Sequence, residues 1–75
     1  MTLGQAIMKF AKEKGMSKYR VAKNSGIPQA TFTDIANGKN NNPTIDTVSK
    51  IACGLDISVA ELIKEAEKTN ENVSE

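Results

Sequence analysis

Apolar residues recur at helical spacing along most of this 75-residue chain. In the first stretch they stand at i, i+3, i+4, i+7 and i+8, which places them on one face of a helix. These residues are Leu3, Ala6, Ile7, Phe10 and Ala11. Thr2 with Gln5 three residues later fits a capping box, and Gly15 suits the end of a helix. The pattern predicts a first helix from near Leu3 to Gly15.

A second, shorter helix is predicted to begin after Ser17, because a serine side chain can accept a hydrogen bond from a backbone N–H of the first turn. Val21 and Ala22 would face inward. Gly26 would end this helix, since glycine suits the left-handed position that follows a helix.

A proline marks the start of the third helix. Proline disfavours a helical conformation at the residue before it and suits the first helical turn. The helix is predicted from about Pro28 to Asn37, with Gly38 in the left-handed position after it. Its apolar residues Phe32 and Ile35 make only a narrow stripe, so most of its surface is left for polar side chains.

Two further helices follow a polar loop, KNNNP, at residues 39–43. Thr44 is the expected cap of the fourth, and Ser58 with a glutamate three residues later fits a capping box at the start of the fifth. The residues expected to face the core are Ile45, Val48, Ile51, Ala52, Leu55, Val59, Leu62, Ile63 and Ala66. Residues 68–75 are almost free of apolar anchors, which predicts a disordered polar tail behind a single domain of residues 1–67.

The second and third helices are spaced to form a helix-turn-helix. A small side chain at Ala22 lets the third helix cross close to the second, and Gly26 permits the left-handed backbone of a short turn. Ile27, Phe32 and Ile35 would then hold the pair on the core. The chain is accordingly predicted to be all-α and compact, with five short helices.

This arrangement would point a row of side chains on the third helix away from the domain. The row consists of Gln29, Ala30, Thr31, Thr33, Asp34 and Asn37. These side chains are short or moderate in length and mostly uncharged, as suits contacts with base edges in the major groove of DNA. An ordinary solvated face is the alternative that the pattern leaves open.

Charge is unevenly divided along the chain. The whole sequence has ten Lys or Arg and nine Asp or Glu, a net charge of +1. Residues 1–42 carry a net charge of +5, and residues 43–75 carry a net charge of −4. Such a division gives one end of the molecule a positive field that attracts a polyanion. The lysines of the first helix, Lys9, Lys12 and Lys14, are expected to be plain surface residues.

The composition argues against an enzyme. Histidine is absent, and no Gly-rich phosphate loop, carboxylate pair in an apolar pocket or Cys/His metal spacing occurs. No cofactor, metal or small-molecule ligand is therefore expected. The single cysteine, Cys53, cannot form an internal disulfide, and no stretch is long and apolar enough to span a membrane. These features predict a cytoplasmic protein in which Cys53 is partly exposed.

The stretch from Ser17 to Gly38, SKYRVAKNSGIPQATFTDIANG, resembles the helix-turn-helix of the Cro/phage-repressor type, the XRE family. The similarity continues through NPTIDTVSKIACGLDISVAELI and covers about residues 3–66. It implies a five-helix, lambda-repressor-like DNA-binding domain whose third helix enters the major groove. The sequence departs from the family pattern at Pro28, where Ser or Thr often caps the third helix, and at Ser25, where a bulky apolar residue is common.

The resemblance also implies roles for individual residues. The positions that match the base-reading part of the third helix are Gln29, Ala30, Thr31, Thr33 and Asp34. The positions that match phosphate-contacting regions are Ser17, Lys18, Asn37, Lys39, Asn40, Asn41, Asn42 and Thr44. Backbone N–H groups at the starts of the second and fourth helices would join them.

The resemblance implies a function and partners as well. Members of the family often pair through the fifth helix, so Leu62, Ile63 and Ala66 are expected to form the interface of a homodimer on a pseudo-palindromic operator. The expected function is sequence-specific binding of double-stranded DNA by a transcriptional regulator, in the first place a repressor. Phage repressors, restriction controllers and antitoxins all fit. The alternative is a protein-interaction module on the same scaffold, such as an antitoxin-like or adaptor protein.

Overall fold

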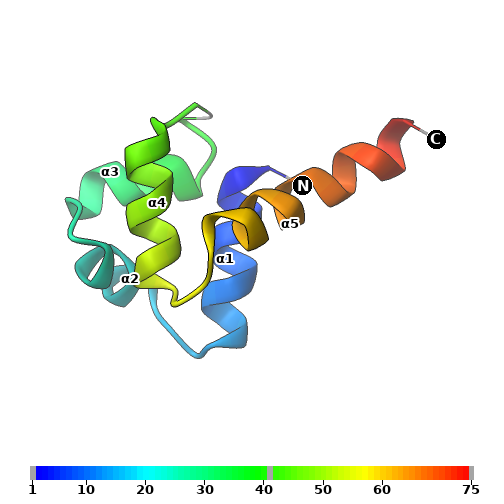
Figure 1. Ribbon diagram of the computed structural model, residues 1–75. Coiled ribbons are helices and arrows are strands. Elements are labelled where there is room, and N and C mark those ends of the chain that lie inside the picture. The colour runs from blue at the N-terminus through cyan, green and yellow to red at the C-terminus, as the bar shows by residue number, and fades with distance from the viewer. Residues whose placement is uncertain (1, 41, 75) are drawn as a thin grey trace.

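Five helices and no strand make up the part of the chain that the computed structural model describes, residues 2–40 and 42–74. Side chains are described as far as Lys68. The helices are α1 Leu3–Glu13, α2 Lys18–Ser25, α3 Gln29–Ala36, α4 Ile45–Gly54 and α5 Val59–Ser74. Figure 1 shows α4 standing in front of α3, with α1 and α5 together on the other side. The all-α, five-helix prediction is confirmed.

Side-chain caps begin four of the five helices at the expected residues. The capping side chains are those of Thr2, Ser17, Thr44 and Ser58. Two of them form capping boxes, because the Gln or Glu three residues later accepts a hydrogen bond from the backbone N–H of the cap. The exception is α3, which starts at Gln29 with Pro28 as its N-cap and has no side-chain cap.

The core lies where the five helices meet, and every helix contributes to it. Its largest fully buried side chains are Phe32, Ile7, Ile35, Ile51, Leu55, Leu62 and Val21. The prediction that Ile45 faces this core is wrong, because its side chain is 69% exposed. Ile45 occupies the first turn of α4, on the flank of the helix that carries the half-buried Ser49 one turn later.

A glycine brings α4 against the end of α2. An ideal Cβ added to Gly54 would lie 2.2 Å from Ser25 Oγ and 2.9 Å from the backbone nitrogen of Ser25. Only a residue without a side chain allows this approach. Ser25 is 7% exposed, and its hydroxyl has no hydrogen-bond partner among the described residues. The close packing of α2 on α4 therefore buries a polar group without satisfying it.

An ion pair joins α5 to α1. The Lys9 ammonium of α1 donates to the carboxylate of Glu65 in α5, and Lys68 lies 3.2 Å from the other carboxylate oxygen. Glu65 is only 8% exposed. The hydrogen bonds from Lys9 and Lys68 hold the pKa of Glu65 below its ordinary value of 4.5, and the bond to Glu65 raises the pKa of Lys9 from 10.5. Lys9 is exposed, as expected of a surface lysine, but it also links two helices, which the sequence pattern does not predict.

The fifth helix continues to Ser74, past the point where the polar tail is expected to begin. The polar sequence predicts disorder in this segment, but its backbone is helical as far as Ser74. The division into a domain of residues 1–67 and a tail of residues 68–75 stays a prediction. Within the described residues, none of the helices has the length and apolar character needed to cross a membrane.

Replacing Ser25 by Ala should raise the free energy of unfolding by about 1 kcal/mol, because the change removes a buried hydroxyl that no described residue satisfies. Urea unfolding measures the change. Ser49→Ala, on the half-buried flank of α4, is the control for the higher helix propensity of alanine. A loss of stability in Ser25→Ala would show that the hydroxyl is satisfied in solution.

Replacing Glu65 by Gln should lower the stability at neutral pH and weaken its pH dependence. Because the folded-state pKa of Glu65 lies below 4.5, the contribution of the ion pair is fully present above that value. It is lost as the pH falls through the lower folded-state pKa. Urea unfolding of the wild-type protein and the variant from neutral to acidic pH should show that their difference in free energy of unfolding shrinks in acid. A difference that does not depend on pH would contradict the pairing.

Candidate nucleic-acid interface

The turn between α2 and α3 has the backbone geometry of a helix-turn-helix. Gly26 ends α2 with a φ of +72°, in the left-handed region that glycine enters at no steric cost. The N–H of Ile27 donates to the carbonyl of Ala22 at 3.2 Å, which folds the turn back on the end of α2. Phe32 and Ile35 lie on the inner side of α3, and their side chains are completely or almost completely buried in the core. The turn thus fixes α3 across α2 with its other side facing outward.

The outer side of α3 carries the side chains that the sequence predicts to read bases. Gln29, Ala30 and Thr31 are exposed, and Thr33 and Asp34 are half-buried. Among the described residues, no lysine or arginine forms an ion pair with Asp34. Its carboxylate oxygens are therefore available as acceptors, and their charge disfavours a nearby phosphate unless a donor intervenes.

The starts of α2 and α4 present backbone donors. The hydroxyl oxygen of Ser17 accepts from the N–H of Arg20 at 3.1 Å, and that of Thr44 accepts from the N–H of Thr47 at 3.2 Å. The first two N–H groups of each helix have no partner within the helix. Together with the positive end of the helix dipole, such groups form an anion-binding surface.

The loop after α3 folds back over the end of that helix. The N–H of Asn40 donates to the carbonyl of Asp34 at 3.0 Å, and the N–H of Asn42 donates to Asn40 Oδ1 at 3.1 Å. Lys39, Asn40 and Asn42 are exposed, as is Asn37 at the end of α3. Asn41, which is also predicted to contact phosphate, lies outside the described residues.

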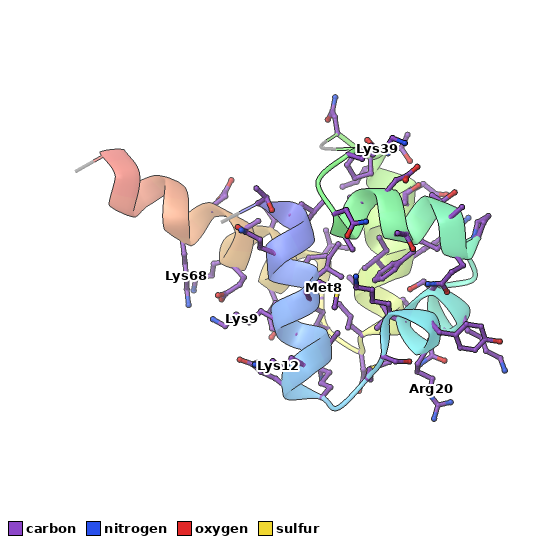
Figure 2. The ribbon with its side chains drawn as sticks, turned by 180° about the vertical axis from the view of Figure 1, so that it is seen from behind. Met8, Lys9, Lys12, Arg20, Lys39 and Lys68 are labelled. Atoms are coloured by element: carbon purple, nitrogen blue, oxygen red, sulfur yellow. The ribbon has the colours of Figure 1, made fainter. Side chains whose placement is uncertain are left out.

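The positive side chains are divided between two sides of the molecule. Figure 2 shows Arg20 and Lys39 at the two ends of the helix-turn-helix, with α2 and α3 between them. Lys9, Lys12 and Lys68 lie along α1 and α5 instead. Lys18 is exposed in the first turn of α2. Exposed Arg20 has no contact assigned to it by the sequence analysis, although it stands two residues after Lys18 in the first turn of α2 and belongs to the positive half of the chain.

The predicted dimer residues of α5 do not all reach the surface. Leu62 is 0% exposed, so it lies in the core of its own chain and cannot contact a second one. The prediction that Leu62 forms part of a dimer interface is therefore wrong, because its side chain packs completely into the core from the inner face of α5. Ile63 and Ala66 are half-buried and remain predictions.

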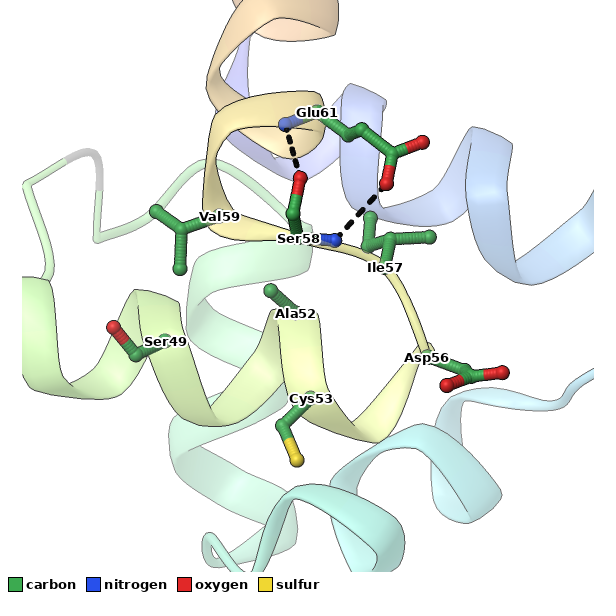
Figure 3. Close-up of a pocket in the computed structure, with 8 residues that line it drawn as sticks. All are labelled: Ser49, Ala52, Cys53, Asp56, Ile57, Ser58, Val59 and Glu61. Carbon is green, nitrogen blue, oxygen red and sulfur yellow. Dashed lines mark hydrogen bonds between the residues drawn. The ribbon is translucent and has the colours of Figure 1, made fainter.

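A shallow pocket of about 430 Å³ lies between the end of α4 and the start of α5, as Figure 3 shows. Ser49 and Val59 lie together at one side of it, and exposed Cys53 lies on α4. Of the described residues that line this pocket, Asp56 and Glu61 carry carboxylates and none is a lysine or arginine. It is therefore electrostatically unlike the surface around α3 and unsuited to phosphate.

A helix-turn-helix with exposed polar residues on its second helix and backbone donors beside it defines the fold and surface of a DNA-binding domain. The comparison with known families agrees, since the model of the Cro/C1-type HTH DNA-binding domain matches residues 6–65. The chain belongs to this family. Its membership confirms the resemblance that the sequence carries between Ser17 and Gly38.

The curated relatives are transcriptional regulators of bacilli. The HTH-type transcriptional regulators SinR of Bacillus licheniformis and SinR of Bacillus subtilis are each 33% identical over 67 residues, which cover 89% of this chain and 60% of the relative. SlrR of Bacillus subtilis is 26% identical over 72 residues, covering 96% of this chain and 47% of SlrR. The chain thus spans 60% of the length of the SinR relatives.

Three solved structures that resemble this fold are of SinR. The N-terminal DNA-binding domain of SinR from Bacillus subtilis has a TM-score of 0.75 and 33% identity, covering 81% of this chain and 88% of that one. SinR in complex with DNA has a TM-score of 0.77 and 32% identity, covering 83% and 98%. The SinR/SinI complex gives 0.80 and 32%, covering 91% and 66%.

Proposed function

We propose that this chain binds double-stranded DNA sequence-specifically and regulates transcription as a repressor, reading the major groove with α3. The observation that carries the proposal is the outer side of α3, whose side chains stay exposed or half-exposed while Phe32 and Ile35 fill the core. The likeness to a SinR structure described as a complex with DNA supports it. Such a regulator acts where the chromosome is, which places it in the cytoplasm of a bacterium.

The side chains of α3 suit particular base edges. Gln29 can bond in a bidentate manner to adenine N6 and N7, and Ala30 can contact a thymine methyl group. Asp34 can accept from cytosine N4, and the same carboxylate repels a phosphate placed at that site. Thr31 and Thr33 can serve bases or phosphates. The domain would therefore read a short half-site in which adenine and cytosine contribute most of the discrimination.

The phosphates on either side of the groove would be held by the two flanks of the helix-turn-helix. On one flank stand Ser17, Lys18 and the free N–H groups at the start of α2. On the other stand Lys39, the exposed asparagines of the loop and the start of α4. These contacts fix the register of the protein on the duplex, whereas the side chains of α3 provide sequence discrimination.

A second copy of the chain would supply the affinity that one domain lacks. A module of this size buries about 600–1,000 Å² on DNA, and a net charge of +1 provides little general attraction. A homodimer doubles the contacts and suits a pseudo-palindromic site whose half-sites stand about 34–36 Å apart. Dimerisation on DNA therefore belongs to the same proposal.

The surface for pairing runs across α4 and α5. Exposed Ile45 stands one helical turn before Ser49, Ser49 and Val59 line one side of the same pocket, and Ile63 stands one turn after Val59. The half-buried Ala66 follows Ile63 along α5. Burial of the exposed Ile45 side chain against the equivalent surface of a second copy would stabilise the dimer, because it removes apolar area from water.

The rival function, a protein-interaction module, is separated by a band-shift experiment. If the chain binds DNA, it should shift a duplex that was selected from a random library. Added salt should lower the affinity, and the slope of log affinity against log salt concentration should grow with the number of phosphates contacted. No shift of any duplex at low salt would contradict DNA binding and favour the rival.

Replacing Ile45 by Gln should weaken self-association by at least about tenfold, since each copy would lose the burial of an aliphatic side chain. Sedimentation of the free protein and of its complex with the selected duplex measures the stoichiometry. Tyr19→Gln is the matched control, because Tyr19 is similarly exposed, at 65%, but lies on α2. A wild-type chain that is monomeric both free and on DNA would contradict the dimer.

Gln29→Ala and Lys39→Ala should weaken DNA binding in different ways. Loss of the Gln29 amide should relax the preference at one base pair by about 1–3 kcal/mol. Loss of the Lys39 charge should weaken binding to all sequences alike and reduce the salt slope by about one unit. Affinities for single-base variants of the selected duplex over a salt series measure both effects. Equal losses on selected and scrambled DNA for both variants would contradict these roles.

A further inference from the structure

Gly4 stands where the first turn of α1 meets the last turn of α3. An ideal Cβ added to Gly4 would lie 2.5 Å from the carbonyl oxygen of Ile35 and 2.6 Å from that of Ala36. Both oxygens belong to the backbone, so no change of side-chain rotamer can relieve the contact. The missing side chain of Gly4 therefore decides how closely α1 approaches the end of α3, which Figure 1 shows beside the start of the chain.

The contact joins helix ends of opposite partial charge. The start of a helix carries a partial positive charge and its end a partial negative charge. α1 starts and α3 ends at this contact, so the approach is electrostatically favourable. The start of the loop after α3 bonds to the same turn, because the N–H of Gly38 donates to the carbonyl of Ile35 at 3.1 Å.

The last turn of α3 also carries the far end of its outer row. Asp34 directly precedes Ile35, and Asn37 directly follows Ala36. Phe32 anchors the middle of the helix in the core. A push on the carbonyls of Ile35 and Ala36 would therefore tilt α3 about this anchor and move its outer side chains.

We infer that Gly4 is a positioning residue for DNA reading, because it lets α1 lie against the last carbonyls of α3 and so sets the angle at which α3 stands out from the domain. The inference rests on the proposed function for its effect on DNA. Gly4 touches no base in this account, and its effect passes through the backbone of α3.

The variant Gly4→Ala should reduce discrimination between the duplex that the wild-type chain selects from a random library and a scrambled duplex of the same composition. The expected loss is about tenfold, the effect of one lost base contact. Binding to the scrambled duplex should change less, since phosphate contacts come mainly from α2, α4 and the loop. Ala11→Gly, two turns along α1, is the matched control: it lowers stability through the poor helix propensity of glycine and should keep the discrimination ratio.

A second measurement follows the geometry without DNA. Backbone residual dipolar couplings of the free protein give the orientation of α3 relative to α4, which should change in Gly4→Ala and stay the same in Ala11→Gly. If Gly4→Ala does not fold, Thr2→Ala takes its place. It removes the capping box that begins α1 and loosens the same turn without adding atoms, so it should change the same two quantities to a smaller degree.

The outcomes distinguish the inference from the proposed function. A wild-type chain that selects no duplex contradicts the proposed function, and the dipolar couplings still decide the role of Gly4. A folded variant with an unchanged α3 orientation and an unchanged discrimination ratio would overturn the inference.

Discussion

Close backbone approach at small residues is the constraint on which the rest of the structure depends. Gly4 lets α1 lie against the end of α3, and Gly54 lets α4 lie against the end of α2. The helix-turn-helix is thus braced from both sides by contacts that any side chain would prevent. Because protein interiors are densely packed and do not deform continuously, such contacts fix the position of a helix. The outer side of α3 remains outside as a consequence.

Positive and negative side chains gather on different parts of the surface. Lys18, Arg20 and Lys39 lie around α2 and α3, whereas carboxylates predominate at the corner of α4 and α5. Lys9 pairs with Glu65 and so holds α5 on α1, whereas Lys68 pairs with the same carboxylate within α5. With a net charge of only +1, general attraction to DNA is weak, so the proposed binding would depend on directed contacts and on the proposed pairing of two chains.

Local features of the fold were predictable from the sequence, because caps and turns act within a few residues. Thr2, Ser17, Thr44 and Ser58 cap as expected, and Gly26 makes the turn. Ile45 was misplaced, the dimer role of Leu62 was wrong and the link made by Lys9 was missed, because these depend on how separate helices cross, which periodicity does not specify. A glycine inside a helix, as at Gly4 and Gly54, was the available signal of close approach. The outward row of α3 follows from the same local pattern, whereas its base-reading role comes from the family resemblance and stays a prediction.

The most direct test of the account is an NMR titration of the ¹⁵N-labelled chain with a duplex selected by that chain. If the bracing of α2 and α3 presents the outer side of α3 to DNA, the amide shifts should concentrate on α3, the loop after it and the starts of α2 and α4. They should saturate at the stoichiometry of the complex. Shifts confined to α4 and α5, with the amides of α3 unchanged, would contradict the presentation of α3 to DNA.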